Sequence, residues 1–156
     1  LTIWENVAFG LIHGKGMSKK EAYRIALEKI EAVDLDLKVA DIYPAELSGG
    51  MQKRVGLARA IATNPRVIFF DEPTTGLDPI VSGTINDLIR RCVTDLGASA
   101  ISITHDMHSL RIIADKVGLL FKGNLVWQGS VNEIDNSSNA YVDQFINGKA
   151  HGPFTD

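Results

Sequence analysis

A short, unbroken apolar run that ends in two adjacent carboxylates places the strongest constraint on the fold of this chain. The run is Val67–Phe70, and Asp71 and Glu72 follow it directly. A short apolar run of this kind is typical of a strand that is covered on both faces within a parallel sheet. Ligands of open α/β sheets bind at the carboxyl ends of such strands. The two carboxylates are therefore candidates for a functional site.

The residues after this run continue as a helix and a second strand. Asp78 followed by Pro79 is an N-cap with proline at the first helical position, and Gly97 is expected to end that helix. Ala100–Thr104 is predicted to be another buried strand. Strands that alternate with helices indicate a parallel α/β sheet.

The last third of the chain is predicted to hold a short helix, a hairpin and a final helix. Either Thr104 or Asp106 caps the short helix. The remaining elements are strands at Lys116–Phe121 and Leu125–Gln128 around a tight turn at 122–124, a capping box that begins at Ser130, and a helix from Asn139 that Gly148 closes.

The residues before Asn64-Pro65 are predicted to be helical. Capping boxes begin at Thr2 and Ser18, and Ser48 is placed to cap a third helix. Apolar residues recur at helical spacing after each of them. We therefore expect a helical subdomain over 1–65, part of a parallel α/β core over 66–148, and a tail over 149–156.

Composition and charge limit the class of protein to which this chain can belong. The 156 residues are 45% apolar and carry a net charge of −3, which suits one compact core and gives no general attraction to nucleic acid. No apolar run approaches the roughly 20 residues of a membrane-spanning helix. The single cysteine, Cys92, is predicted to be a small buried hydrophobe. Because the chain opens at Leu1 directly into a helix-start signal, it is expected to be a fragment of a longer protein.

Ser48-Gly49-Gly50 at a predicted helix start is a candidate phosphate contact. Two glycines there weaken the helix by about 1 kcal/mol each relative to alanine. They also let an anion approach the bare N–H groups at the positive end of the helix dipole. The competing interpretation is an ordinary junction between a loop and a helix.

Each polar residue near the strand ends has a candidate role and an ordinary alternative. An aspartate such as Asp71 can hold Mg²⁺ through water, and Glu72 can orient or deprotonate an attacking water. His105, which follows the second strand, is a candidate γ-phosphate contact. Asp78 is most simply an N-cap, with a subunit-bridging role as the alternative. The competing interpretation is a solvated acidic turn for Asp71 and Glu72 and an ordinary loop residue for His105.

No phosphate-binding loop of the Gly-x-x-x-x-Gly-Lys-Ser/Thr type occurs in the chain. The segment 10–16 contains glycines and Lys15, but its glycine spacing is one residue short and no serine or threonine follows the lysine. We therefore expect this chain alone to be inactive, because the loop that would hold a nucleotide's phosphates is missing from it.

The order of these motifs resembles the ATPases of ABC transporters. The corresponding segments are the signature motif at Leu47–Met51, the Walker B strand at Val67–Glu72, the D-loop at Gly76–Asp78 and the switch histidine at Thr104–Asp106. The resemblance implies the later part of a P-loop NTPase (RecA-like) core preceded by the ABC helical subdomain. It also implies ATP and Mg²⁺ as ligands and a homodimer in which each signature motif contacts the ATP held by the partner.

By this resemblance, each candidate residue acquires a role. Ser48, Gly49 and Gly50 would contact ATP, and Asp78 would lie near it at the subunit boundary. Glu72 would act on the attacking water, and His105 would contact the γ-phosphate. Asp71 would help to hold Mg²⁺.

A narrower resemblance is to Mla-type phospholipid transport ATPases. Met51 stands where the signature motif usually has glutamine. The other matching stretches are Asp78–Ile80, Thr104–Ser109, Tyr141–Gly148 and Gly152-Pro153. This resemblance implies an inner-membrane permease and accessory subunits as partners, phospholipid as cargo and a location on the cytoplasmic face of the inner membrane.

Two other classes remain as alternatives. If the protein has no phosphate-binding loop at all, it is a non-catalytic interaction protein that docks on a permease. An ABC ATPase of DNA repair or translation is the other alternative, although the coiled-coil insertions or tandem domains common there are not visible in this sequence.

Overall fold

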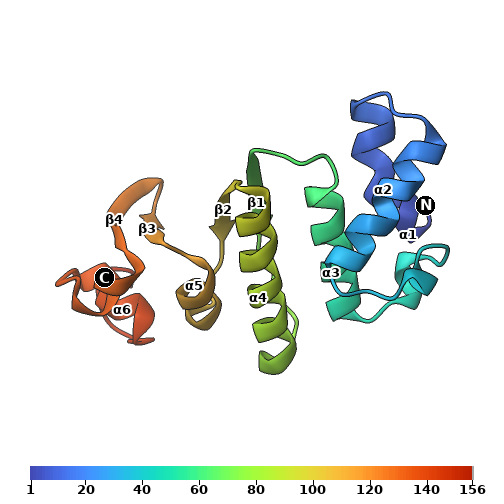
Figure 1. Cartoon of the computed structure of the whole chain (residues 1–156). Coiled ribbons are helices and arrows are strands. Elements are labelled where there is room, and N and C mark those ends of the chain that lie inside the picture. The colour runs from blue at the N-terminus through green and yellow to red at the C-terminus, as the bar shows by residue number, and fades with distance from the viewer. Residues whose placement is uncertain (156) are drawn as a thin grey trace. The chain divides into compact units, whose positions relative to one another are not determined.

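The computed structural model describes residues 1–155, which divide into two compact units (Figure 1). The first unit comprises Leu1–Thr104, and the second begins at His105. The first contains α1 (Ile3–Phe9), a π-helix (Gly10–Gly14), α2 (Lys19–Ala32), two 3₁₀ turns (Leu37–Val39 and Pro44–Glu46), α3 (Gly49–Ile61), β1 (Val67–Asp71), α4 (Pro79–Leu96) and β2 (Ser99–Ile103). The second contains α5 (Met107–Ile113), β3 (Lys116–Phe121), β4 (Asn124–Ser130), a 3₁₀ helix (Val131–Asn136) and α6 (Ala140–Ile146).

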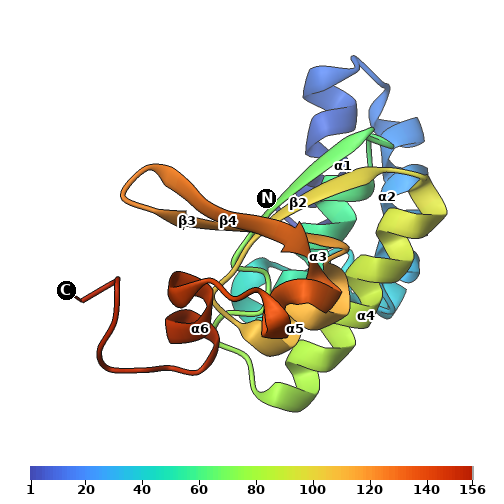
Figure 2. The ribbon, with the colours of Figure 1, turned by 90° about the vertical axis from the view of Figure 1, so that its left-hand side faces the viewer.

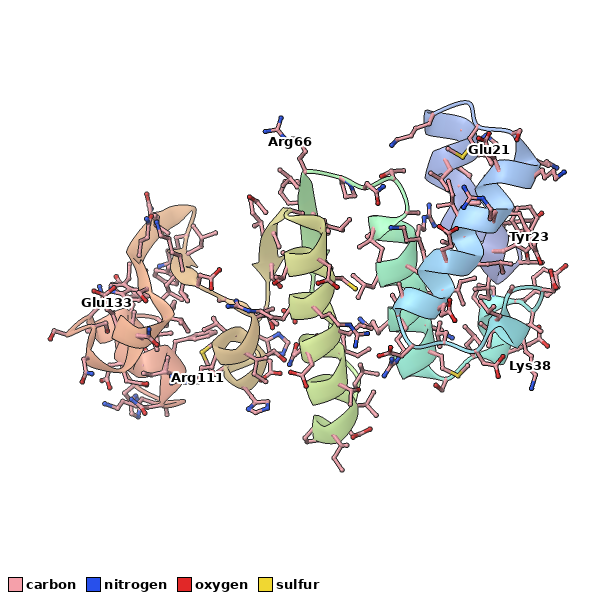
Figure 3. All side chains as sticks on the ribbon, viewed as in Figure 1. Glu21, Tyr23, Lys38, Arg66, Arg111 and Glu133 are labelled. Carbon is pink, nitrogen blue, oxygen red and sulfur yellow. The ribbon has the colours of Figure 1, made fainter. Side chains whose placement is uncertain are left out.

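The helices α1, α2 and α3 pack against one another and bury the apolar series that the sequence predicts. Their starts use the expected caps. The Thr2 N–H donates to Glu5 Oε2 at 2.9 Å, and Ser18 Oγ accepts from the Glu21 N–H at 3.3 Å. Tyr23, which Figure 3 labels on α2, packs edge-on against the Trp4 ring of α1, with centroids 5.1 Å apart. The predicted helical character of this region is confirmed.

An ion-pair cluster ties the end of α2 to α3 and α4. The Arg91 guanidinium of α4 donates to both carboxylate oxygens of Asp34 at 2.9 Å. Arg54 of α3 donates to the Val33 carbonyl at 2.9 Å and lies 3.5 Å from Asp34. Because the cluster is largely exposed, it fixes the geometry of three helix segments more than it adds free energy of folding.

The two strands β1 and β2 pair in parallel, with α4 as the crossover between them (Figure 2). Their register places Phe69 opposite Ile101 and Asp71 opposite Ile103. Asp78 caps α4, since its Oδ1 accepts from the N–H groups of Ile80 and Val81, both at 3.0 Å. The parallel α/β arrangement predicted for this region is confirmed.

The prediction that both strands are covered on both faces is wrong for the part of the chain that the structure describes. Ile68 is 4% exposed, whereas Phe69, its neighbour on the opposite face, is 75% exposed. Ile101 and Ile103 of β2 are also exposed. Within residues 1–155 β1 and β2 pair only with each other, and one apolar face of the pair stays open.

Cys92 lies on the buried side of α4, as predicted. Its side chain is 5% exposed, and burial raises the pKa of the thiol above its ordinary value. A raised pKa keeps the thiol protonated at neutral pH and makes it a poor nucleophile.

The second unit contains the predicted hairpin. β3 and β4 pair antiparallel, and Lys122 and Gly123 form the turn with positive φ angles of 47° and 79°. Positive φ at both central residues matches the turn type that suits the twist of a hairpin. Arg111 of α5 makes a bidentate ion pair with Asp135 at 2.7 and 2.8 Å, and Figure 3 shows where Arg111 lies.

Two open points in the second unit are decided by the structure. Asp106, not Thr104, caps α5, because its Oδ1 accepts from the His108 N–H at 2.9 Å. Phe154 of the tail packs within the second unit. Its ring packs against Phe121 and Tyr141 with centroids 4.8 and 5.3 Å away, and its N–H donates to Gln144 Oε1 at 2.8 Å.

None of the helices within residues 1–155 has both the length and the apolar character that crossing a bilayer requires.

Helices α3 and α4 approach each other closely at Gly50. A Cβ atom built on Gly50 would lie 2.8 Å from Val81 Cγ1, which is closer than real contacts allow. At the neighbouring Gly49 the nearest atom would be Leu77 Cδ2 at 3.5 Å, an ordinary contact. Gly50 is therefore needed for helix packing, whatever else it does.

We expect Gly50→Ala to lower the free energy of unfolding by about 1–3 kcal/mol, because the added methyl group overpacks the contact with Val81. Gly49→Ala is the matched control and should not destabilise, since alanine fits there and favours the helix. Urea unfolding followed by circular dichroism measures both. Equal stabilities of the two variants would contradict the packing role of Gly50.

Phe154→Ala is expected to loosen the second unit. The substitution removes the edge-on contacts with Phe121 and Tyr141, each worth about 0.5–1.5 kcal/mol. Hydrogen exchange of the α6 amides should therefore become faster, while exchange in α2 stays unchanged. His151→Ala, at an exposed position of the same tail, is the control. Unchanged protection of α6 in Phe154→Ala would show that the tail does not support the unit.

Candidate functional site

The start of α3 presents backbone N–H groups to solvent. Ser48 and Gly49 are exposed and Gly50 is half-buried. Ser48 Oγ accepts from the Met51 N–H at 3.3 Å, which satisfies one first-turn donor. The remaining first-turn N–H groups have no partner within the helix, because no helical carbonyl precedes them. They lie at the positive end of the helix dipole. This end of α3 can receive an anion.

Gln52 holds the loop that leads into this helix start. Its Nε2 donates to the carbonyl of Pro44 at 2.9 Å and to that of Leu47 at 3.2 Å. Gln52 was not predicted as a site residue, because a glutamine on the exposed side of a helix carries no sequence signal of such a contact.

Glu72 sits directly beyond β1 in a left-handed backbone conformation. Its φ angle is 47°, and its N–H donates to the Ile103 carbonyl of β2 at 2.9 Å. The Thr75 hydroxyl donates to Glu72 Oε2 at 2.8 Å. The carboxylate is therefore placed by the strand pair and oriented by the turn that follows.

Lys53 connects α3 to this turn. Its Nζ donates to the Glu72 carbonyl at 3.0 Å. Lys53 was not predicted as a site residue either, since a lysine near the start of a helix belongs to no recognisable motif. The contact shows that the helix that begins after Ser48 and the strand end that carries Glu72 belong to one local structure.

Asp71 is the exposed last residue of β1. A Mg²⁺ ion bound to a nucleotide keeps several waters and the phosphate oxygens as ligands, and it takes only one or two carboxylates from the protein. One exposed carboxylate at a strand end fits that requirement. Within residues 1–155 no group of three or more histidine, cysteine or acidic residues is placed to hold a metal ion.

Asp78 and the loop before it lie next to the start of α3. A Cβ atom on Gly49 would meet Leu77, and one on Gly50 would meet Val81, so residues on either side of Asp78 lie near this helix start. The Asp78 Oδ1 serves as the N-cap of α4. The candidate residues Ser48, Gly49, Gly50 and Asp78 are thus brought together in the first unit.

His105 opens the second unit and is exposed. Its neighbour Asp106 holds the local backbone. Ser109, fully buried, donates its hydroxyl to Asp106 Oδ2 at 2.6 Å. This hydrogen bond holds the pKa of the Asp106 carboxyl below its ordinary value, so the cap of α5 stays charged at neutral pH. The capped turn fixes the backbone next to His105.

Comparison with known proteins finds similarity to one family. The family model described as "ABC transporter" matches residues 1–75. The chain is 37% identical to the intermembrane phospholipid transport system ATP-binding protein MlaF of Haemophilus influenzae, over 98% of this chain and 58% of that protein. It is 42% identical to the methionine import ATP-binding protein MetN of Lactobacillus acidophilus, over 85% of this chain and 37% of that protein.

A solved structure shares the fold. The ATP-binding cassette MJ0796, in a dimeric post-hydrolysis state bound to ADP and Pi, matches with a TM-score of 0.72 and 33% identity. The match covers 84% of this chain and 57% of that one. The chain thus spans about half the length of the relatives and structures it matches. The P-loop NTPase fold class predicted from sequence is confirmed, and the chain is similar to ATP-binding domains of the ABC transporter type.

Proposed function

We propose that this chain forms the signature-motif half of an ATPase subunit that powers an ABC transporter. The start of α3 at Ser48, Gly49 and Gly50 binds the phosphates of an ATP held by the phosphate-binding loop of a second copy. Glu72 accepts the proton of the attacking water. The protein is a homodimer, and hydrolysis in the dimer drives a membrane permease.

The observation that carries this proposal is the link between α3 and the end of β1. An open helix start suited to phosphate and an oriented carboxylate at a strand end are joined by the contact of Lys53 with the Glu72 carbonyl. An interaction protein without catalysis would need neither the strained turn at Glu72 nor the carboxylate orientation by Thr75.

Each remaining candidate residue has a defined task in this proposal. Asp71 holds Mg²⁺, which neutralises phosphate charge when bound. His105 donates a hydrogen bond to the γ-phosphate. Asp78 caps α4 beside the signature helix and reaches the subunit boundary. Loss of the γ-phosphate removes the charge that bridges the two copies, and the dimer then opens.

Phospholipid is the cargo we propose for the transporter. The 37% identity to MlaF extends over 98% of the chain, including the C-terminal stretches that resemble the Mla-type ATPases. The partners would then be an inner-membrane permease and accessory subunits, with the ATPase on the cytoplasmic face. Methionine import is the second candidate, because the identity to MetN is 42% over 85% of the chain.

Glu72→Gln in the complete protein should nearly abolish ATP turnover while leaving ATP binding intact. The amide keeps the size of the side chain but cannot accept a proton, and loss of a general base costs about 10²–10⁴-fold. Steady-state phosphate release and binding of a fluorescent ATP analogue measure the two properties. Glu31→Gln, at an exposed position of α2, is the control with unchanged turnover. Turnover of Glu72→Gln near that of the control would refute the role of Glu72.

The cargo proposal predicts that the complete protein co-purifies with a permease whose bound molecules are phospholipids. Mass spectrometry of the extracted complex identifies them. ATP turnover of the complex in nanodiscs should rise when phospholipid donor vesicles are supplied. Stimulation by methionine, with no response to phospholipid, would establish the MetN-like alternative.

A further inference from the structure

We propose that Thr75 and Lys53 are positioning residues that hold Glu72 from two sides, one at its carboxylate and one at its backbone. The inference rests on the proposed role of Glu72 as the base for ATP hydrolysis. It adds two residues to that role, neither of which belongs to the signature sequence or the strand.

The backbone of Glu72 needs support. A non-glycine residue with a φ of 47° occupies a sparsely populated region, and such conformations persist when surrounding contacts fix them. The Glu72 N–H is held by the Ile103 carbonyl of β2 at 2.9 Å. Lys53 holds the carbonyl of the same residue at 3.0 Å. The peptide groups on both sides of the Glu72 Cα are therefore anchored to different elements.

Lys53 suits this task because of its position and chemistry. Its side chain is half-buried and reaches from α3 across to the turn. An ammonium group offers three hydrogen-bond donors and no acceptor, so it can donate to a carbonyl oxygen. Hydrogen bonds from a charged donor are stronger than those between neutral groups.

Thr75 fixes the direction of the carboxylate. Its hydroxyl donates to Oε2 at 2.8 Å, three residues after Glu72 in the same turn. The Thr75 N–H also donates to the Glu72 carbonyl at 3.3 Å, which closes the turn. With Oε2 held, rotation of the carboxylate is restricted, so the direction of the whole carboxylate group is fixed.

The expected effect is on the rate of chemistry and not on ATP affinity. Misplacing a catalytic group by about 1 Å can cost about 10²-fold in rate, whereas the groups that bind phosphate are unchanged. Removing either contact should therefore lower kcat and leave KM for ATP within about twofold.

The first test replaces the Thr75 hydroxyl in the complete protein. Thr75→Val is isosteric and should lower kcat about 10- to 100-fold at unchanged KM, and Thr75→Ser should restore most of the rate because it keeps the hydroxyl. Thr84→Val, at an exposed position of α4, is the matched control. Because Thr75 is exposed, thermal stability should not change in any of the three variants.

The second test replaces the Lys53 ammonium group. Lys53→Met keeps the length of the side chain and should also lower kcat about tenfold at unchanged KM, whereas Lys53→Arg should retain most of the rate. Lys20→Met, on an exposed part of α2, is the control. Melting temperatures separate a loss of fold from a loss of positioning.

The outcomes distinguish this inference from the proposed function. Wild-type kcat in Thr75→Val and Lys53→Met, together with an inactive Glu72→Gln variant, overturns the positioning roles alone. A proportional rise in KM, or failure of Thr75→Ser to restore the rate, overturns them as well. Near wild-type turnover of Glu72→Gln overturns the base assignment and the positioning roles together.

Discussion

The parallel pairing of β1 with β2 is the constraint on which the candidate site depends. The pairing runs to the end of both strands and continues one residue further, where the Glu72 N–H donates to the Ile103 carbonyl at 2.9 Å. This bond brings the chain into the left-handed turn that carries the acidic side chain. Lys53 reaches the same turn from α3, so the helix start and the strand end share one anchoring point.

The glycines at the start of α3 serve two physical requirements. Gly50 lets α3 approach α4 closely, since a side chain there would meet Val81. Gly49 has room for a methyl group and is exposed, so its lack of a side chain is better explained by access to the backbone N–H groups. A motif that appears as one unit in the sequence thus divides into a packing residue, Gly50, and a residue proposed for phosphate binding, Gly49.

Local signals predicted most elements correctly because caps and turns act over a few residues. Ser48, Asp78 and Asn139 each accept first-turn N–H groups at the helix starts expected for them. Contacts between distant residues were not predictable in the same way. Gln52, Lys53 and Thr75 touch the site through side chains that are common on any polar helix or turn.

The sequence by itself determined the order of the helices and strands and the fold class of the domain, because capping, periodicity and motif spacing are local properties of the chain. Only the tertiary structure decided which face of β1 is covered, since exposure of Phe69 at 75% depends on neighbours and not on its own hydrophobicity. It also decided that Phe154 packs within its own unit. Both outcomes depend on which surfaces meet in space, and no spacing of residues along the chain encodes that directly.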